Sequence, residues 1–466
     1  MKLLGIDEII AAIGGRPLGE PPGGAVGQVC IDSRKLTDRS IFFAIRGEQH
    51  DGHDFVEQAL AGGAVAAICA DVSKLPQAFQ RDGRIITVPD TTEALGRLAA
   101  WYRKQLAAQV IAVAGSNGKT TTKDILTTVL STRRRGRGAA ASFNNAIGVP
   151  LTLLSAEASD EFVVVEIGTN HPGEIRALGR IARPNIAVIT SIGEEHLEFF
   201  GNVETVAKEE LSLLPCLRDR GFVAMSEDAA RYASPEDLKA RGAVIYGLSE
   251  ECHLRAEGLT CDARGQRFLL NGRREFHVPL LGAHNAVNAL AAVAVGTRLR
   301  MTEEEIAAGL TQVKPAKMRL ESTICGEITL INDAYNANPA SVRAALAVLD
   351  EFSGAARKVL ILGDMRELGA ASEREHTAIG REAGRSTAQV IMAAGGFARF
   401  VADGAASVAG TTKRVYPFQS VAALADRLDS LIEPGDLVLL KASRAGRFEQ
   451  LIPKLEEIGR RVPARA

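Results

Sequence analysis

The segment VIAVAGSNGKTTTKDIL, residues 110–126, contains the residue types that bind phosphate. Glycines let backbone amides approach a phosphate, the start of a helix adds its positive end, and a lysine adds a full charge. A hydroxyl directly after the lysine can ligate Mg²⁺. The segment therefore predicts a triphosphate-binding loop, with Lys119 on the outer phosphates and Thr120 on the metal. The predicted ATP contacts, through backbone amides, are Gly115, Ser116, Asn117, Gly118, Lys119, Thr120 and Thr121.

This loop departs from the common GxxxxGK[ST] pattern, which requires glycine at position 113, where Val113 stands. The alternative interpretation is a glycine-rich turn between a strand and a helix, with an exposed lysine. The apolar run before the loop, the helical pattern after it and the Lys-Thr pair together favour the phosphate-binding interpretation.

Other polar residues follow apolar runs, where ligands of open α/β sheets bind. Glu166 ends the run in EFVVVEIG, and a carboxylate there can hold Mg²⁺ directly or through water, although a surface glutamate is the alternative. His196 follows NIAVITSIG, and a lone histidine is most often structural. Asn285 and Asn288 share one helix face and can contact an adenine edge. Asp333 ends a strand pattern and can bind ribose hydroxyls.

The elements that position these residues are alternating strands and helices. The runs QVIAVAG, EFVVVEIG, NIAVITSIG and GFVAMS are continuously apolar, as in parallel strands buried on both faces. A second alternating series begins near residue 314 and predicts a Rossmann-like domain. We therefore expect an α/β protein with three domains: a small α/β domain at 1–86, a central ATP-binding domain with a mostly parallel sheet at 87–313, and a Rossmann-like domain at 314–466.

Composition sets the class of protein. The chain has 466 residues, 46% hydrophobic and 24% charged, with a net charge of −1. This near-neutral balance argues against a general nucleic-acid binder. The six cysteines form no CxxC pair, so they predict reduced thiols rather than a disulfide framework or zinc site. No window approaches the ~18 apolar residues of a membrane span. We expect a cytoplasmic, monomeric protein that binds neither nucleic acid nor membrane.

Several segments together resemble the Mur ligase family, the ATP-dependent amide ligases of peptidoglycan synthesis. They are AVAGSNGKTTTK, FNNAIGVPLTLL, VVVEIGTNHPGEI, TSIGEEHLEFFG, LLGAHNAVNALAAVAVG, INDAYNANPASVRAAL and KASRAGRFE, which has Ala442 where the family usually has glycine. The resemblance implies ATP and Mg²⁺ as cofactors. It also implies UDP-N-acetylmuramoyl-tripeptide and D-alanyl-D-alanine as substrates, and an acyl phosphate as intermediate.

The resemblance also implies roles for individual residues. The catalytic set would be Lys119, Glu166, His196 and Lys208, and the metal ligands Thr120, Glu166, His196 and Lys208, the last as a carbamate formed with CO₂. Carbamate formation needs a neutral amine, which burial or nearby cations favour. The family often shows AKAKxE at this point, whereas the present chain has AKEEL from residue 207.

Further contacts are implied outside this catalytic set. Arg319 would lie near the ATP phosphates, with Asn285 and Asn288 on the nucleotide and Asp333 on its ribose. The substrate-binding candidates are Ser33, Arg34 and Lys35 in DSRK, Arg46 in RGEQHDGHDF, Asn144 and Asn145 in FNNAIG, and Asn336 in YNANP. By residue type alone, the first four form only a polar loop.

Three other functions are weighed against this one. A related ligase that adds a free amino acid usually has a DxPR-type segment, which the chain lacks. The segment YNANP is a poor match to folylpolyglutamate synthetase, a more distant relative. A non-catalytic nucleotide-binding module has no need of Glu166, His196 and Lys208 together.

Overall fold

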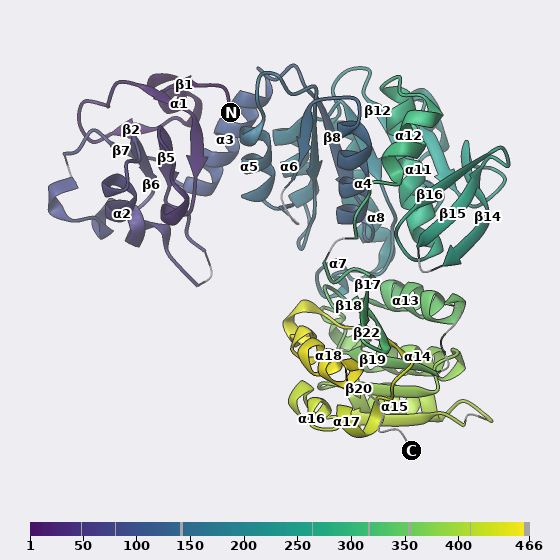
Figure 1. Ribbon diagram of the computed structural model, residues 1–466. Helices are drawn as coiled ribbons and strands as arrows, with labels where there is room; N and C mark the ends of the chain where they lie inside the picture. Colours follow the sequence, from purple (N-terminus) through teal and green to yellow (C-terminus); the bar gives the residue numbers. More distant parts are fainter. Residues whose placement is uncertain are drawn as a thin grey trace.

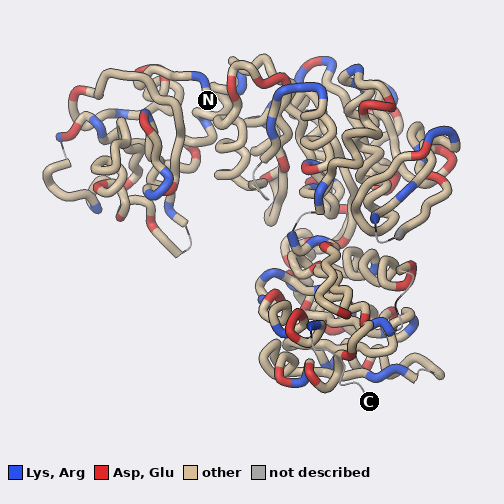
Figure 2. The backbone as a smooth tube through the Cα atoms, in the orientation of Figure 1, with Lys and Arg blue, Asp and Glu red and all other residues tan. Residues whose placement is uncertain are grey.

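The computed structural model describes residues 1–466 except 48, 80, 140–142, 263, 316, 353, 354, 356, 411 and 461–466, and the side chain of 262. The chain forms three lobes (Figure 1), each built on its own sheet. The N-terminal lobe joins the central lobe beside α3, and the C-terminal lobe lies below the central lobe in this view. Basic and acidic residues are interspersed along all three lobes (Figure 2), in keeping with the net charge of −1.

The N-terminal lobe contains a five-stranded sheet in the order β2-β7-β6-β5-β4. Strands β4 to β7 are parallel and β2 is antiparallel at the edge. A two-stranded pair, β1 with β3, lies apart. The elements are β1 (Leu4–Gly5), α1 (Ile6–Ile13), β2 (Arg16–Pro17), β3 (Ala25–Val26), β4 (Gln28–Cys30), β5 (Ser40–Phe43), α2 (Val56–Ala61), β6 (Ala66–Cys69), β7 (Ile85–Thr87) and α3 (Thr91–Arg103). Helix α3 contacts α1 as well as α5 and α6 of the central lobe, so it links the two.

The central lobe contains a nine-stranded sheet in the order β16-β15-β14-β13-β12-β11-β8-β10-β9. Its strands are β8 (Gln109–Ala114), β9 (Gly136–Gly138), β10 (Phe162–Glu166), β11 (Ile186–Ile189), β12 (Phe222–Ser226), β13 (Val244–Gly247), β14 (Leu254–Asp262), β15 (Gly265–Leu270) and β16 (Arg274–Val278). Its helices are α4 (Lys119–Ser131), α5 (Gly148–Ser155), α6 (Glu174–Ala182), α7 (Leu197–Phe200), α8 (Val203–Leu211), α9 (Glu227–Ala230), α10 (Pro235–Ala240), α11 (Ala283–Arg298) and α12 (Glu303–Leu310).

The apolar runs in this sheet are parallel strands with both faces buried, as predicted. In β8, Val110, Ala112 and Ala114 pack into one core and Ile111 and Val113 into the other. Helices α4, α11 and α12 contact one another over the second of these cores. The antiparallel extension from β14 to β16 was not predicted.

The C-terminal lobe contains a six-stranded sheet in the order β17-β18-β22-β19-β20-β21. All neighbours are parallel except β17 with β18. The strands are β17 (Glu321–Cys325), β18 (Ile328–Asp333), β19 (Arg357–Gly363), β20 (Val390–Ala394), β21 (Arg414–Phe418) and β22 (Asp436–Lys441). The helices are α13 (Pro339–Glu351), α14 (Ser372–Arg385), α15 (Ala398–Ala406), α16 (Val421–Ala425), α17 (Leu428–Leu431) and α18 (Ile452–Arg460). This is the Rossmann-like sheet expected from the sequence.

The three sheets lie close to the predicted domain limits, with the first ending at Thr87 and the last beginning at Glu321. The limits at 86 and 313 themselves stay a prediction. Among the described residues, no helix combines the length and the apolar character needed to cross a bilayer.

Candidate active site

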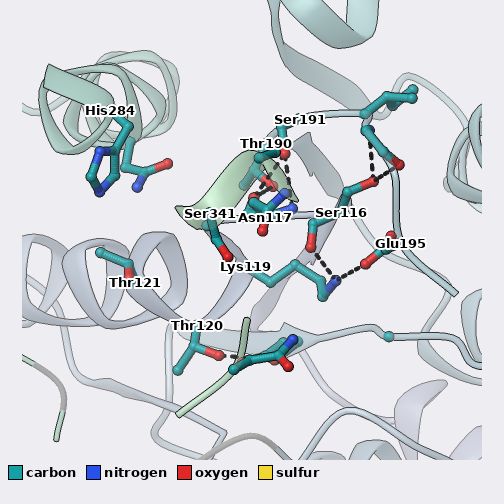
Figure 3. A pocket seen from close by; sticks show the side chains of 18 of the residues that line it. Ser116, Asn117, Lys119, Thr120, Thr121, Thr190, Ser191, Glu195, His284 and Ser341 are labelled. Atoms are coloured by element: carbon teal, nitrogen blue, oxygen red, sulfur yellow. Dashed lines mark hydrogen bonds and ion pairs between the residues drawn. The ribbon is translucent and has the colours of Figure 1, made fainter. Parts of the chain in front are cut away.

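A cavity of about 740 Å³ opens where the carboxyl ends of the central strands face the C-terminal lobe. Most of the predicted site residues line it, from both lobes. They are Ser116, Asn117, Gly118, Lys119, Thr120, Thr121, Asn144, Asn145, Glu166, His196, Asn285, Asn288, Arg319, Asp333 and Asn336. Figure 3 shows how the loop residues and the adjacent Thr190, Ser191 and Glu195 gather at one side of it.

The two glycines of the loop are required by backbone shape and by close neighbours. Gly115 has φ +124° and Gly118 has φ +83°, in the region that side chains other than glycine rarely adopt. A Cβ atom on Gly115 would lie 2.5 Å from Thr190 Oγ1, and one on Gly118 would lie 2.7 Å from Asn288 Oδ1. The glycines therefore let the loop pack against the protein itself.

The amides at the start of the loop are hydrogen-bonded within the protein. The N–H of Gly115 donates to Glu210 Oε2 at 2.6 Å, that of Ser116 to the Ser191 carbonyl at 2.8 Å, and that of Asn117 to Ser191 Oγ at 2.9 Å. The first three amides of residues 115–121 are therefore engaged within the protein, and their predicted contact with phosphate stays a prediction. Residues 119–121 at the start of α4 line the cavity, and the start of a helix is a favourable place for a phosphate.

Lys119 lies among carboxylates at the bottom of this loop. Its Nζ donates to the carbonyls of Gly115 and, at 3.1 Å, of Ser116, and it forms an ion pair with Glu195 Oε2 at 3.5 Å. Burial alone would lower the pKa of Lys119, but the carboxylates of Glu195 and Glu210 raise it above its ordinary value. Lys119 is therefore a permanent cation at neutral pH.

Thr120 and Glu166 meet at the carboxyl end of β10. The Thr120 hydroxyl donates to Glu166 Oε1 at 3.1 Å, and Asn144 Nδ2 donates to the same oxygen at 3.1 Å. Glu166 is 1% exposed, and its Oε2 is buried with no hydrogen-bond donor among the described residues. A buried carboxylate oxygen with no donor beside a hydroxyl is a set of ligands that fits Mg²⁺.

No group of three or more His, Cys, Asp or Glu side chains in the described ranges is arranged to hold a metal by itself. Mg²⁺ is commonly held by one or two carboxylates together with phosphate oxygens and water. The observation therefore agrees with a cation that enters with the nucleotide.

His196 lies at the border between the central and C-terminal lobes. It has φ +47°, and its Nδ1 forms an ion pair with Glu367, a residue of the C-terminal lobe. The Glu198 N–H donates to the Glu367 carbonyl at 3.4 Å, which strengthens the same junction. His196 lines the cavity, as predicted, but its ring is engaged by a carboxylate that the sequence analysis did not single out.

Lys208 is exposed on α8 and does not line the cavity. The predicted role of this lysine as a catalytic residue and, when carbamylated, a metal ligand therefore does not agree with its position. The residue of α8 that reaches the loop is Glu210, which is 0% exposed. Burial, together with the neighbouring carboxyl of Glu195, raises the pKa of Glu210 well above its ordinary value, whereas Lys119 opposes the rise.

The wall formed by α11 holds His284, Asn285 and Asn288. Asn285 Nδ2 donates to the Leu281 carbonyl at 2.8 Å, and Asn288 Nδ2 donates to Asn285 Oδ1 at 3.0 Å. Part of the amide capacity of this pair is thus used inside the protein. Burial lowers the pKa of His284 from 6.5 to about 4, so this ring is neutral at physiological pH.

The guanidinium group of Arg319 extends from the C-terminal lobe to the phosphate loop. Its Nη2 donates to Thr120 Oγ1 at 3.3 Å, and its guanidinium lies over the Tyr335 ring, 4.2 Å from the ring centre. This places Arg319 at the position where nucleotide phosphates would meet Lys119 and Thr120.

Asp333 and Asn336 are held by Lys441 at the end of β22. Lys441 Nζ forms an ion pair with Asp333 Oδ2 at 2.7 Å and donates to the Asn336 carbonyl at 2.7 Å. Asn338, next in the same segment, donates from Nδ2 to Asn117 Oδ1 at 3.1 Å. The segment therefore ties the C-terminal lobe to the phosphate loop.

Asn144 and Asn145 have different tasks in the structure. Asn144 contacts Glu166, whereas Asn145 Oδ1 accepts the N–H groups of Ile147 at 3.1 Å and Gly148 at 2.9 Å. Asn145 thereby shapes the turn into α5, which is the commoner use of asparagine at such a position.

The substrate candidates of the N-terminal lobe do not line this cavity. Arg34 pairs with Asp32 at 2.8 Å, Arg46 with Asp51 at 3.1 Å, and Ser33 Oγ donates to Gln58. Lys35 lies 3.8 Å from Asp32. Their role in binding a substrate stays a prediction.

Sequence reasoning missed Glu195, Glu210, Ser191 and Glu367. Glu195 and Ser191 stand in the segment TSIGEEHLEFFG that was singled out for His196, so their position after β11 was an available signal. Glu210 stands in the segment AKEEL that was considered for Lys208, whereas Glu367 reaches the site through long-range packing, for which the sequence offers no pattern.

Comparisons with known proteins agree with this architecture. Three family models match: the Mur ligase family catalytic domain at residues 26–103, the Mur ligase middle domain at 113–296 and the Mur ligase glutamate ligase domain at 318–444. A protein of Bacillus subtilis, named UDP-N-acetylmuramoyl-tripeptide--D-alanyl-D-alanine ligase, is 36% identical over 92% of this chain and 93% of its own. One of the same name from Escherichia coli is 34% identical over 92% and 94%.

Solved structures show the same likeness. A crystal structure of MurF from Acinetobacter baumannii has a TM-score of 0.87 at 31% identity, covering 98% of this chain and 99% of that one. MurF ligase from Thermotoga maritima in complex with ADP has a TM-score of 0.78 at 24% identity, covering 93% and 97%, which shows a shared fold.

Proposed function

The chain belongs to the Mur ligase family, and from this premise we propose that it uses ATP to join D-alanyl-D-alanine to UDP-N-acetylmuramoyl-tripeptide. The product is the amide of the tripeptide, with ADP and phosphate released, in the synthesis of peptidoglycan. The expected fold, family and ligase activity agree with the three family models and with the named relatives. The related ligase that adds a free amino acid remains the alternative to test.

One observation supports this function most directly. Lys119, Arg319, and the Thr120–Glu166 pair converge on a single cavity formed by two lobes. Two cations and a metal-compatible carboxylate at the start of a helix form a site for a nucleotide triphosphate.

The chemistry requires this concentration of positive charge. A carboxylate is a poor electrophile, so the tripeptide carboxylate first attacks the γ-phosphorus of ATP and the bond to ADP breaks. Each pair of unit charges at ~4 Å costs about 1 kcal/mol in water and several times more in a drier site. We propose that Lys119 turns from its own loop carbonyls toward the phosphates, while Arg319 faces them from the C-terminal lobe, so that the two anions can meet.

Mg²⁺ would be held by Thr120 and Glu166, in the cavity that His196 also lines, and would neutralise developing phosphate charge. The unpartnered Oε2 of Glu166 supports this assignment. The amine of D-alanyl-D-alanine then attacks the acyl phosphate carbon and forms the C–N bond of a tetrahedral intermediate. The intermediate collapses to the amide as phosphate leaves and the nitrogen loses a proton.

Acyl phosphates hydrolyse, so the reaction needs water kept out. The contacts of Arg319 with Thr120, Asn338 with Asn117 and Glu367 with His196 cross from one lobe to the other. We propose that these contacts close the C-terminal lobe over the bound substrates.

The decisive experiment is an assay of phosphate release with purified protein. We expect release only when ATP, UDP-N-acetylmuramoyl-tripeptide and D-alanyl-D-alanine are all present. Turnover with free amino acids in place of the dipeptide would instead favour the alternative ligase. Mass spectrometry of the products from lysine- and diaminopimelate-containing nucleotides would identify the third residue of the natural substrate.

A cytoplasmic location and a monomeric state stay predictions. No disulfide joins the described cysteines, which supports a reducing compartment, where ATP is also available. Size-exclusion chromatography with light scattering tests the oligomeric state.

A further inference from the structure

One helix decides which side chain of the AKEEL segment reaches the phosphate loop. Successive residues of a helix turn by about 100°, so residues two apart point in nearly opposite directions. Lys208 of α8 is exposed, and Glu210 of the same helix is fully buried against Gly115. A carbamate on Lys208 would therefore face solvent rather than the loop.

The family segment AKAKxE and the segment AKEEL from residue 207 differ at their fourth position. The family pattern has lysine at its second and fourth positions. This chain has Lys208 at the second and Glu210 at the fourth. The structure shows that the fourth position is the buried one, and there this chain has a carboxyl group in place of a lysine.

The surroundings of Glu210 contain unpartnered carboxylate oxygens that a cation could bind. Its Oε2 accepts the Gly115 N–H at 2.6 Å, while the carbonyl of the same residue accepts from Lys119 Nζ. Glu195, which is 8% exposed, pairs with Lys119 at 3.5 Å. The Oε1 atoms of Glu195 and Glu210 are both buried and have no hydrogen-bond donor in the described part of the chain. One ammonium group balances only one of the two buried carboxyl groups, in keeping with the raised pKa of Glu210, so ionisation of both would need a further cation, more so when Lys119 turns toward phosphate.

We propose that Glu210, as an unmodified carboxylate, takes the place of a carbamylated lysine in this chain and joins Glu195 in binding a divalent cation behind the phosphate loop. This inference rests on the proposed function, because the cation would act with ATP. It dispenses with the step in which a lysine nitrogen attacks CO₂ and loses a proton to form a carbamate. Turnover in this chain therefore needs neither Lys208 nor CO₂.

The first test asks whether the native protein carries a carbamate. Protein equilibrated with ¹³C-bicarbonate is examined by ¹³C NMR, and we expect no carbamate resonance. Lys208→Ala is expected to keep native turnover in buffer depleted of CO₂. A carbamate resonance that disappears in Lys208→Ala would overturn the inference.

The second test measures cation binding without turnover. Free Mn²⁺ is titrated by electron paramagnetic resonance in the presence of a non-hydrolysable ATP analogue. Glu210→Gln preserves the shape of the side chain but removes its charge, and we expect one Mn²⁺ site to weaken at least about tenfold, the lower end of the range for residues that merely support metal ligands. Glu204→Gln, the same change on the exposed face of α8, is the matched control and should bind as the native protein does. Native binding in Glu210→Gln would overturn the inference.

A third variant converts the site. In Glu210→Lys, the introduced amine lies where the family has lysine, so we expect a carbamate resonance and turnover that rises when bicarbonate is added. If the native protein released no phosphate with the three substrates, the proposed function would fail. The NMR and Mn²⁺ measurements would still decide the role of Glu210.

Discussion

The carboxylate of Glu367 in the C-terminal lobe pairs with the imidazole of His196 in the central lobe. Both residues have positive φ, +63° and +47°, which is uncommon for side chains of this size. Such backbone conformations persist only where surrounding contacts maintain them. The pair therefore forms a contact between the two lobes, at the edge of the candidate active site, that the surrounding structure maintains.

Breaking this pair should loosen the lobes. In Glu367→Gln we expect a larger radius of gyration without nucleotide, measured by small-angle scattering, because the pairing of the Glu367 carboxylate with His196 is lost. Adding an ATP analogue and substrates should restore compaction through the remaining contacts. Glu373→Gln, an exposed glutamate on α14, is the control and should leave the radius unchanged. Identical scattering from Glu367→Gln and the native protein would show that the pair does not hold the lobes.

Lys119→Ala should abolish most turnover while leaving the fold intact. The ammonium group is the cation nearest the loop and offsets the repulsion between substrate carboxylate and phosphate. Loss of one such group from a preorganised site lowers kcat about 10²- to 10³-fold. Phosphate release under saturating substrates measures the effect, with circular dichroism to check folding. The exposed Lys104 offers a control as Lys104→Ala, and native kcat in Lys119→Ala would refute the proposed mechanism.

Gly118→Ala should damage the phosphate loop by collision as well as strain. Its φ of +83° costs alanine roughly 1–2 kcal/mol, and its Cβ would lie 2.7 Å from Asn288 Oδ1. We expect ATP affinity, measured by calorimetry, to fall at least about tenfold, which corresponds to about 1.4 kcal/mol. Gly173→Ala is a close control, since Gly173 begins α6 with φ +92° and has nothing within 4 Å of its Cβ position. Equal ATP affinities in the two variants would exclude the collision.

The neutral state of His284 predicts a pH dependence of stability. Its pKa lies at about 4 in the folded protein against 6.5 for the free side chain. Between these values the unfolded chain binds a proton that the folded chain does not, so stability falls as the pH drops from 6.5 toward 4. The limiting slope is about 1.4 kcal/mol per pH unit.

His284→Gln removes this proton-binding difference. We therefore expect its thermal unfolding midpoint to fall less than that of the native protein when the pH changes from 7 to 5. Asp333 and Lys441 face the ring and remain in both proteins. The exposed His50 serves as control in His50→Gln. A native-like loss of stability in His284→Gln would contradict the assignment.

The parts of the fold that were predicted correctly are those in which local pattern and burial agree. Strand β10 is apolar up to its last residue, Glu166, because both faces are covered, and its sequence is a continuous apolar run. Strand β15 contains both buried and partly exposed residues, and its polar residues make its sequence resemble that of a loop. The antiparallel extension was therefore missed although the parallel sheet was not.

The same distinction applies to the site. The loop around Gly118 and Lys119 was predictable because phosphate binding depends on a contiguous segment. Lys208 was placed wrongly because helix orientation, rather than residue type, decides which side chain enters the site. Glu367 was missed because it belongs to the C-terminal lobe, and no local sequence pattern predicts its contact with His196.

The cavity walls come from two separately folded sheets, and this has a thermodynamic consequence. A ligand that fills the cavity adds its binding free energy to both sheets at once, according to RT ln(1 + [L]/Kd). Two lobes that melt independently when empty would then melt as a single cooperative unit, so nucleotide occupancy can be read directly from the number of transitions in a calorimetric scan.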